Sequence, residues 1–278
     1  MRLDGLHHVT AITADVATNL DFYGRLLGLR LVWQGVNADD PGMRHVAYGD
    51  ERGSPGSILT FFDMPGVGRG LPGAGMVHRL LLRVAGDEAL DFWERRLAGA
   101  GVASDRMADR LLFSDPEGLG LELVIDDGVD EPLIAAAADV DAHLAIRGMH
   151  AVRAYAADAA SASPVLRNVL GLEPEGDGRW LARGERRQGL VIYDDAPGGR
   201  GTMGRARCTT SRSRSVSAIG MRGASVWRRP GFGRRRCWIG GCSSRSTSAC
   251  RAACCSSSPP MGRGSSSSHP TGWASRSC

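Results

Sequence analysis

The chain contains no lysine, no cysteine before Cys208 and no aspartate or glutamate after Asp195. The missing lysine indicates GC-rich coding DNA, in which arginine codons replace lysine codons. The lack of cysteine before Cys208 excludes a disulfide framework there. The seven cysteines at the end match no paired zinc-ligand spacing, and the arginines among them form no periodic face. Neither a zinc site nor a nucleic-acid-binding surface is therefore predicted.

Charge divides the sequence into two unlike parts. After Gly204 there are 14 basic residues and no acidic one, whereas the preceding part has 20 basic and 30 acidic residues. No apolar run approaches the roughly 18 residues of a membrane span. Asp4 and the His7–His8 pair interrupt any apolar start, so no signal peptide is expected. The composition predicts a cytoplasmic protein with neither a membrane nor a nucleic-acid partner, and it leaves a homo-oligomer open.

A repeat organises the first part. Three segments align, GLHHVTAITAD from Gly5, MVHRLLLRVAGD from Met76 and GMHAVRAYAAD from Gly148. Each has partly alternating character and ends at an aspartate, which is typical of a strand that leads into a helix N-cap. We therefore expect Asp15, Asp87 and Asp158 to cap three helices.

Helical periodicity and strand-like runs follow each opening segment. Apolar residues recur at helical spacing after the aspartates, and Gly28 and Gly171 stand where left-handed residues end helices. Each helix is followed by polar turns and apolar runs, so each segment predicts a βαβββ unit. One such unit is too small to cover its sheet, and the units should pair. The expected boundaries are 1–66, 76–128 and 148–204 for the units, with a linker at 129–147.

The last part, 205–278, reads as a fourth unit in a shifted frame. The connector Phe61–Gly75 leads into a strand, and its repeat Ile192–Gly204 should do the same. Read two bases on, the codons that follow allow Gly-Ala-Val-His-His-Val-Ala-Phe-Ala-Val, which matches Gly5–Ile12. The same shift across Ala253–Arg263 allows Val-Leu-Leu-Glu-Leu-Ala-Thr-Asp-Gly-Pro. We expect this remnant to be disordered, and resequencing the DNA at the Gly204 codon tests the shift.

These units resemble the vicinal-oxygen-chelate superfamily, which includes glyoxalase I, bleomycin-resistance proteins and extradiol dioxygenases. Four units with a Phe-Phe-x-x-Pro connector are most similar to ring-cleaving dioxygenases of the hydroquinone type. The resemblance covers residues 5–204 directly. It implies an α+β fold of tandem βαβββ vicinal-oxygen-chelate modules, three of them intact and the fourth lost to an apparent frameshift.

The resemblance also implies a metal site. In that branch, Fe(II), or alternatively Mn(II), is held by histidines from the opening strands of units one and four and by a glutamate from the last strand of unit four. His8 matches the first ligand, and His7 and Thr10 match positions beside the metal or the substrate. The other two ligand positions fall at Thr209–Thr210 and Ser256–Ser257, where no ligand is encoded.

Each candidate residue also has a structural interpretation. A lone strand histidine such as His8 is usually a hydrogen-bonded structural residue, strand alternation turns His7 to the opposite face, and threonine is common in strands. Glu122 occupies the ligand-glutamate position of unit two, but the matching opening-strand residues are Arg79 and Ala151. An Arg79–Glu122 pair or a solvated Glu122, rather than a second metal site, is expected there.

The predicted family function is O2-dependent cleavage of a hydroquinone- or catechol-like ring, with a small aromatic substrate and O2 as partners. This chain, with one ligand of three, is predicted to bind iron poorly and to be inactive. Two alternatives stay open. One is a glyoxalase-like lyase, and the other is a metal-free binding protein of the bleomycin-resistance type.

Overall fold

A computed structural model of the chain describes residues 3–37, 42–126, 128, 130–158 and 163–205, and the backbone of 219–223. Within these ranges, a strand, a helical segment and three further strands follow one another three times. The predicted α+β fold of tandem βαβββ units is therefore confirmed. The predicted remnant at 205–278 lies outside the described residues, apart from Arg205 and residues 219–223.

The first unit has the helix ends that its sequence predicts. The Asp15 carboxylate accepts hydrogen bonds from the backbone N–H groups of Ala17 and Thr18, and Gly28 has a φ of +66°. The second half of the helix is π-helical. The elements of this unit are β1 (Leu3–Thr13), α1 (Val16–Leu20), η1 (Asp21–Leu26), β2 (Arg30–Val36), β3 (Arg44–Gly49) and β4 (Ile58–Asp63).

The second unit corrects one prediction. Gly86, not Asp87, is the N-cap of its helix, and no side chain caps that end. Asp87 instead lies in the first helical turn, where its negative charge interacts favourably with the positive end of the helix dipole. The elements are β5 (Val77–Val84), α2 (Asp87–Gly99), β6 (Ser104–Arg106), β7 (Arg110–Ser114) and β8 (Gly120–Ile125).

The third unit has the shortest helix. Its elements are β9 (Met149–Ala156), η2 (Val165–Val169), β10 (Glu173–Gly176), β11 (Arg179–Arg183) and β12 (Gln188–Asp195). The expected cap Asp158 is followed by residues outside the described part, so that prediction remains untested. No helix in the described part of the chain is long and apolar enough to cross a membrane.

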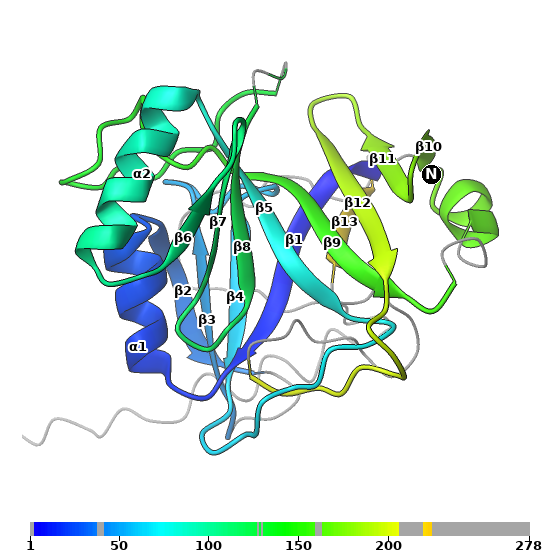
Figure 1. Cartoon of the computed structure of the whole chain (residues 1–278), viewed down its shortest axis with the longest axis horizontal. Coiled ribbons are helices and arrows are strands. Elements are labelled where there is room, and N and C mark those ends of the chain that lie inside the picture. The colour runs from blue at the N-terminus through cyan, green and yellow to red at the C-terminus, as the bar shows by residue number, and fades with distance from the viewer. Residues whose placement is uncertain are drawn as a thin grey trace, which may run out of the picture. The chain divides into compact units, whose positions relative to one another are not determined.

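The described strands form two mixed sheets (Figure 1). Units two and three share an eight-stranded sheet in the order β10-β11-β12-β9-β5-β8-β7-β6, joined where β5 and β9 run antiparallel. Unit one forms a second sheet in the order β13-β1-β4-β3-β2, where β13 is Ile219–Gly223. β13 is antiparallel to β1, as β9 is to β5. The opening strand of unit one therefore has an antiparallel neighbour from the last part of the chain.

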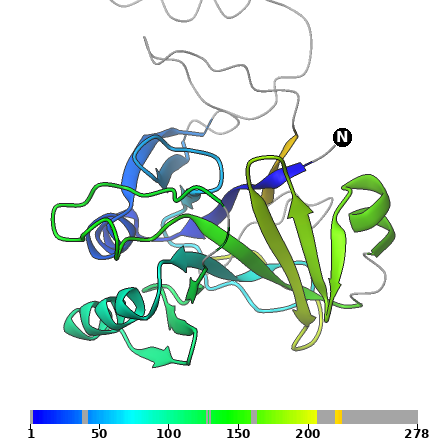
Figure 2. The ribbon, with the colours of Figure 1, turned by 90° about the horizontal axis from the view of Figure 1, so that it is seen from above.

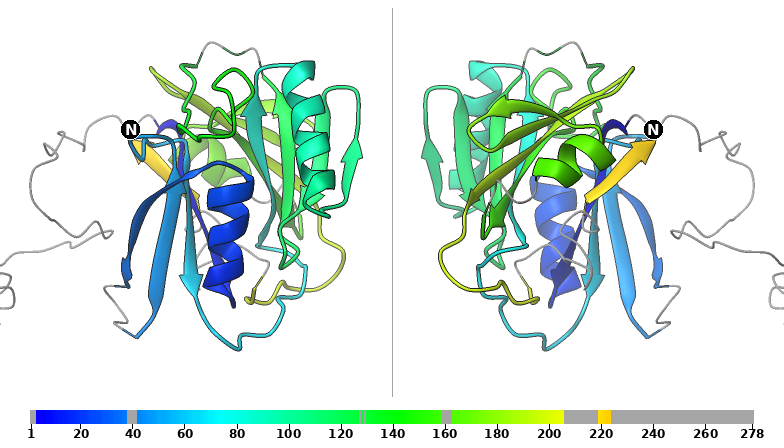
Figure 3. Two further views of the ribbon diagram at one scale, coloured as in Figure 1. Left: turned by 90° about the vertical axis from the view of Figure 1, so that its left-hand side faces the viewer. Right: turned by 90° about the vertical axis from the view of Figure 1, so that its right-hand side faces the viewer.

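One continuous core joins the two sheets. It contains apolar side chains from α1, η1 and α2 and from the strands that these helices cover. Tyr23, Tyr48 and Trp93 are fully buried within it, and the Trp93 indole donates a hydrogen bond to the Leu144 carbonyl oxygen at 2.8 Å. Figure 3 shows α1 against the five-stranded sheet and α2 against strands of unit two. β1 also lies next to β11 and β12 of unit three (Figure 2). The face of each sheet that is turned away from these helices is available for other contacts.

The two repeated connectors bond to each other. The Gly70 N–H donates to the Arg205 carbonyl oxygen at 3.2 Å, and the Gly201 N–H donates to the Ala74 carbonyl oxygen at 3.2 Å. A Cβ atom on Gly204 would lie 2.4 Å from the backbone nitrogen of Gly70, so the two backbones approach too closely for any larger residue. The second connector therefore packs against the first as far as Gly204, after which the composition of the chain changes.

Candidate active site on the five-stranded sheet

The candidate site lies on the face of the five-stranded sheet that is turned away from α1. β1 and β4 pair in parallel, with His8 opposite Ile58 and Thr10 opposite Thr60. β3 pairs with β4 so that His45 stands opposite Phe62. Because alternate strand residues share a face, one set of polar and aromatic side chains gathers there. The set is Thr10, Thr60, His8, His45 and Phe62.

His8 is the predicted metal ligand, and it lies at the centre of this strand pair. Its neighbours in register are Ile58 of β4 and the backbone of Gly220 in β13. Burial lowers the pKa of His8 below its ordinary value, because an imidazolium would lose hydration there. The imidazole is therefore neutral at pH 7, which is the form that binds metals.

His7 does not follow simple strand alternation. The pairing of β1 with β13 shifts register between Leu3 and Leu6 and again between Leu6 and His8, and Gly5 has a φ of +74°. In this irregular backbone the Nδ1 atoms of His7 and His8 lie 3.0 Å apart, and the two rings meet edge to face. His7 is buried and is positioned to orient the His8 ring.

Thr10 lies on the same face as His8, as its spacing predicts. Its hydroxyl oxygen accepts a hydrogen bond from the Thr60 hydroxyl at 3.0 Å. Thr60 stands on β4 at the position that Glu122 occupies on β8, since each lies two residues beyond the partner of His8 or Arg79. Unit one therefore carries a hydroxyl where unit two carries a carboxylate.

His45 was not predicted from the sequence. Its ring centroid lies 5.0 Å from that of Trp33 and 4.5 Å from that of Phe62. Burial, and to a smaller extent the nearby His8, lowers the pKa of His45 to about 4. Its Nε2 atom is buried without a hydrogen-bond partner among the described residues. Alternation along Arg44–Gly49 would have placed His45 on the site face, but only the pairing of β3 with β4 shows which face that is.

The described residues do not form a complete metal site. No group of three or more histidine, cysteine, aspartate or glutamate side chains among them is arranged to hold a metal ion. His8 has two histidine neighbours on this sheet, but no carboxylate joins them in a cluster. The facial metal site that the resemblance implies needs a carboxylate ligand from the last part of the chain, and the sequence has no aspartate or glutamate after Asp195. The residues present therefore do not fit the metal.

The corresponding face of units two and three is built differently. Arg79 stands where unit one has His8, and it pairs with Glu122 at 3.5 Å, which confirms the predicted ion pair. Arg110 binds the other oxygen of Glu122 at 2.9 Å. Ala151, the matching residue of unit three, is fully buried. It belongs to a small apolar cluster that fills the centre of this face: Leu81, Val124, Ala151, Leu181, Leu190 and Ile192.

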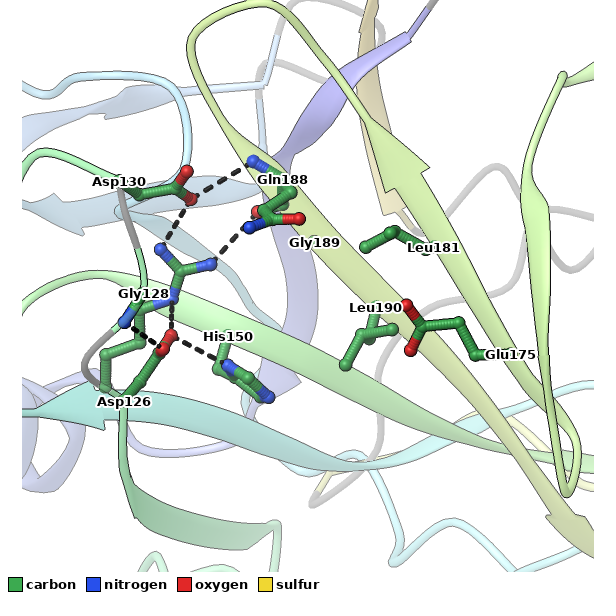
Figure 4. Close-up of a pocket in the computed structure, with 10 residues that line it drawn as sticks. Asp126, Gly128, Asp130, His150, Glu175, Leu181, Gln188, Gly189 and Leu190 are labelled. Atoms are coloured by element: carbon green, nitrogen blue, oxygen red, sulfur yellow. Dashed lines mark hydrogen bonds and ion pairs between the residues drawn. The ribbon is translucent and has the colours of Figure 1, made fainter.

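Histidine–aspartate pairs link units two and three across their shared sheet. His78 of β5 contacts Asp194 of β12 at 2.8 Å, and His150 of β9 contacts Asp126, just after β8, at 2.9 Å. Both histidines precede the His8-equivalent position, as His7 does. Figure 4 shows the contact of Asp126 with His150. Asp126 also lies 2.7 Å from the Arg83 guanidinium. Each pair therefore joins a histidine of one unit to a carboxylate of the other.

Comparisons with known proteins agree with this architecture. Residues 5–123 match the family described as the Glyoxalase/Bleomycin resistance protein/Dioxygenase superfamily. A crystal structure titled as a "putative dioxygenase" from Bacillus subtilis superposes with a TM-score of 0.67 at 35% identity, covering 74% of this chain and 68% of that one. Glyoxalase I from Zea mays, at 12% identity and a TM-score of 0.50, shares the fold alone.

Two curated relatives have names that point to ring cleavage. The "Putative ring-cleaving dioxygenase MhqA" of Bacillus subtilis is 38% identical over 62% of this chain. The chlorohydroquinone/hydroquinone 1,2-dioxygenase of Sphingobium indicum is 30% identical over 71% of it. The matched parts span 56% and 66% of those relatives. With the repeated units, the shared sheet and the site face, these matches show that the chain belongs to the glyoxalase, bleomycin resistance protein and dioxygenase superfamily.

Proposed function

We propose that the chain derives from a ring-cleaving dioxygenase that acts with O2 on hydroquinone- or catechol-like aromatic rings. The observation that carries this proposal is the position of His8. It is a neutral histidine on the face of unit one that is turned away from α1, where it contacts His7. The same face carries Thr10, and it carries His45 between the rings of Trp33 and Phe62. Relatives that are 30–42% identical are named as ring-cleaving dioxygenases, which supports the same reaction class.

The superfamily dioxygenases imply a metal cofactor, and we propose Fe(II), with Mn(II) as the alternative. In the complete site, His8 would supply one ligand and a fourth unit would supply a histidine and a glutamate. This chain has no carboxylate after Asp195, so its last part cannot supply the glutamate. We therefore propose that the chain as it stands binds iron weakly and does not cleave rings.

The test compares this chain with a protein whose reading frame is restored at the Gly204 codon. Oxygen uptake and ring cleavage are measured with hydroquinone and catechol after anaerobic loading with Fe(II). We expect activity only in the restored protein, and its loss in the restored His8→Ala variant. A restored protein that takes up no O2 with either ring contradicts the dioxygenase proposal. Isomerisation of a glutathione hemithioacetal would indicate the lyase alternative. Ligand binding that needs no metal but is lost in His8→Ala would indicate the binding protein.

A further inference from the structure

A cavity of about 130 Å³ lies in units two and three, beside the apolar cluster of their shared sheet. Its wall includes His150, Glu175, Leu181 and Leu190, and Figure 4 shows His150 and Glu175 reaching toward the space beside Leu190 from different strands. None of these residues belongs to the candidate active site. The cavity is therefore a separate feature, lined by residues of β5 and of strands β9 to β12 and by the segment that follows β8.

One pole of the cavity is a histidine with a fixed tautomer. His150 Nδ1 lies 2.9 Å from Asp126, and a carboxylate so placed accepts a hydrogen bond from Nδ1–H. Burial lowers the pKa of His150, although the bond to Asp126 opposes the shift. The ring is therefore neutral at pH 7, and its Nε2 atom is a hydrogen-bond acceptor. The Glu175 carboxylate, exposed at the mouth and 4.0 Å from the Arg179 guanidinium, has a second oxygen that can accept.

Arg83 does not turn this cavity into an anion site. Its guanidinium binds Asp126 at 2.7 Å, Asp130 at 2.6 Å and the Gln188 carbonyl oxygen at 3.1 Å. The Arg83 guanidinium is thus engaged by two carboxylates, and its positive charge offsets much of the negative charge of Asp126 and Asp130. The groups that remain to meet a ligand are neutral or negative acceptors, which match a ligand carrying hydrogen-bond donors.

The remaining wall is apolar. Leu181 and Leu190 are 5% and 6% exposed and belong to the cluster at the centre of the sheet. The volume of the cavity is close to the roughly 150 Å³ of an apolar protein cavity that holds benzene. A flat ring therefore matches the space in size, and the two leucines match it in polarity.

We propose that this cavity binds a small neutral hydroxylated aromatic ring, a phenol or benzenediol, with a ring hydroxyl donating to His150 Nε2 and the ring lying on Leu181 and Leu190. Glu175 accepts a second hydroxyl when one is present. The site needs no metal and uses none of the residues around His8. The proposed binding can therefore be tested independently of the proposed dioxygenase activity.

The test is titration of the full chain with 4-fluorophenol at pH 7, followed by 19F NMR. We expect saturable binding that is roughly fivefold tighter than that of fluorobenzene, because one hydrogen bond is gained. His150→Phe should weaken binding by at least the same factor, and Leu181→Phe should abolish it by filling the cavity. His8→Ala should leave binding unchanged, and so should His143→Gln, which alters an exposed histidine elsewhere.

Thermal unfolding of each variant identifies any that do not fold. If His150→Phe fails to fold, Glu175→Gln replaces it. That substitution alters an exposed carboxylate and should weaken the binding of hydroquinone, which has two hydroxyls, about twofold more than that of 4-fluorophenol. Equal affinity for fluorobenzene and 4-fluorophenol would overturn the proposal. So would binding that disappears in His8→Ala, or tighter binding of 4-fluorobenzylamine, a cation of similar size.

Discussion

The sheet faces that are turned away from α1 and α2 are formed by the same repeated unit, but they differ in the side chains that they carry. On unit one, His8, His7 and His45 stand among aromatic rings and hydroxyls, with little ionic pairing. On units two and three, the His8 position is Arg79 or Ala151, and ion pairs and apolar packing fill the face. Unit one thus has a histidine that could bind a metal at this position, whereas units two and three have residues there that stabilise the fold.

This contrast predicts opposite costs for substitutions at matching places. A buried charge that loses its partners is strongly destabilising, whereas removing a histidine that makes few contacts should change stability little.

Arg83→Met should cost about 3–4 kcal/mol in the free energy of unfolding. Arg83 is 7% exposed and lies between Asp126 and Asp130, so its removal leaves two carboxylates in a poorly solvated site. Urea denaturation measures the change. Arg52→Met, which alters an exposed arginine, is the matched control and should stay within roughly 0.5 kcal/mol. Equal costs for the two variants would show that the network around Arg83 is not structural.

Glu122→Ala and His8→Ala compare the two faces directly. Glu122 is 2% exposed and binds Arg79 and Arg110, so its loss should cost about 2–3 kcal/mol, reduced because both arginines are partly solvated. His8→Ala should cost less than about 1 kcal/mol. Chemical denaturation of both variants checks the ranking. A larger cost for His8 would make it a structural histidine and remove the main support for the proposed site.

The low pKa of His45 should make the stability of this chain depend on pH. Below about pH 6.5 the unfolded chain protonates His45, whereas the folded chain keeps it neutral until about pH 4. The folded state therefore loses stability as the pH falls through that window. The full shift corresponds to about 3 kcal/mol, which we reduce to roughly 2 kcal/mol because the His45 ring is partly solvated, and this contribution is constant above the window. His45→Gln should remove this part of the pH dependence. Unfolding free energies at pH 7 and pH 4 measure it, with His143→Gln as the control; parallel curves for His45→Gln and the unmodified chain would refute the assignment.

Gly204→Ala should destabilise the pairing of the connectors by about 1–2 kcal/mol, because the new methyl group would meet the backbone of Gly70. Gly68→Ala is the matched control, since a Cβ there meets nothing within 4 Å. Amide exchange at Gly70 and Gly201 reports the local effect, and thermal unfolding reports the global one. Equal behaviour of the two variants would mean that the second connector does not pack as the repeat requires.

Much of the fold is readable from the sequence because each unit carries its own signals. Gly28 ends the first helix, Asp15 begins it, and the run Gly120–Ile125 is a strand. What was missed depends on contacts between elements. The cap at Asp87 was wrong because Gly86 takes that position. The edge strands Ser104–Arg106 and Glu173–Gly176 lack an apolar pattern and form only by pairing with a neighbour.

The candidate site divides in the same way. His8 and Thr10 are suggested by one strand and one resemblance, and the Arg79–Glu122 pair by their matching positions. His45, in contrast, reaches the site only through the register of β3 on β4, and the His150–Asp126 contact only through the pairing of two units. Side chains brought together by sheet register cannot be assigned from the periodicity of one segment.

The amount of metal bound per chain is the most direct test of His8 as a metal ligand whose partner ligands this chain lacks. Fe(II) bound per chain would be measured after anaerobic loading and gel filtration, for this chain, for the protein with the frame restored at the Gly204 codon, and for its His8→Ala variant. We expect about one ion per chain in the restored protein and much less than one in the other two, because facial coordination needs three ligands together. One tightly held ion in this chain, or an ion that the restored protein keeps after His8→Ala, would contradict the assignment of His8 and the loss of its partner ligands.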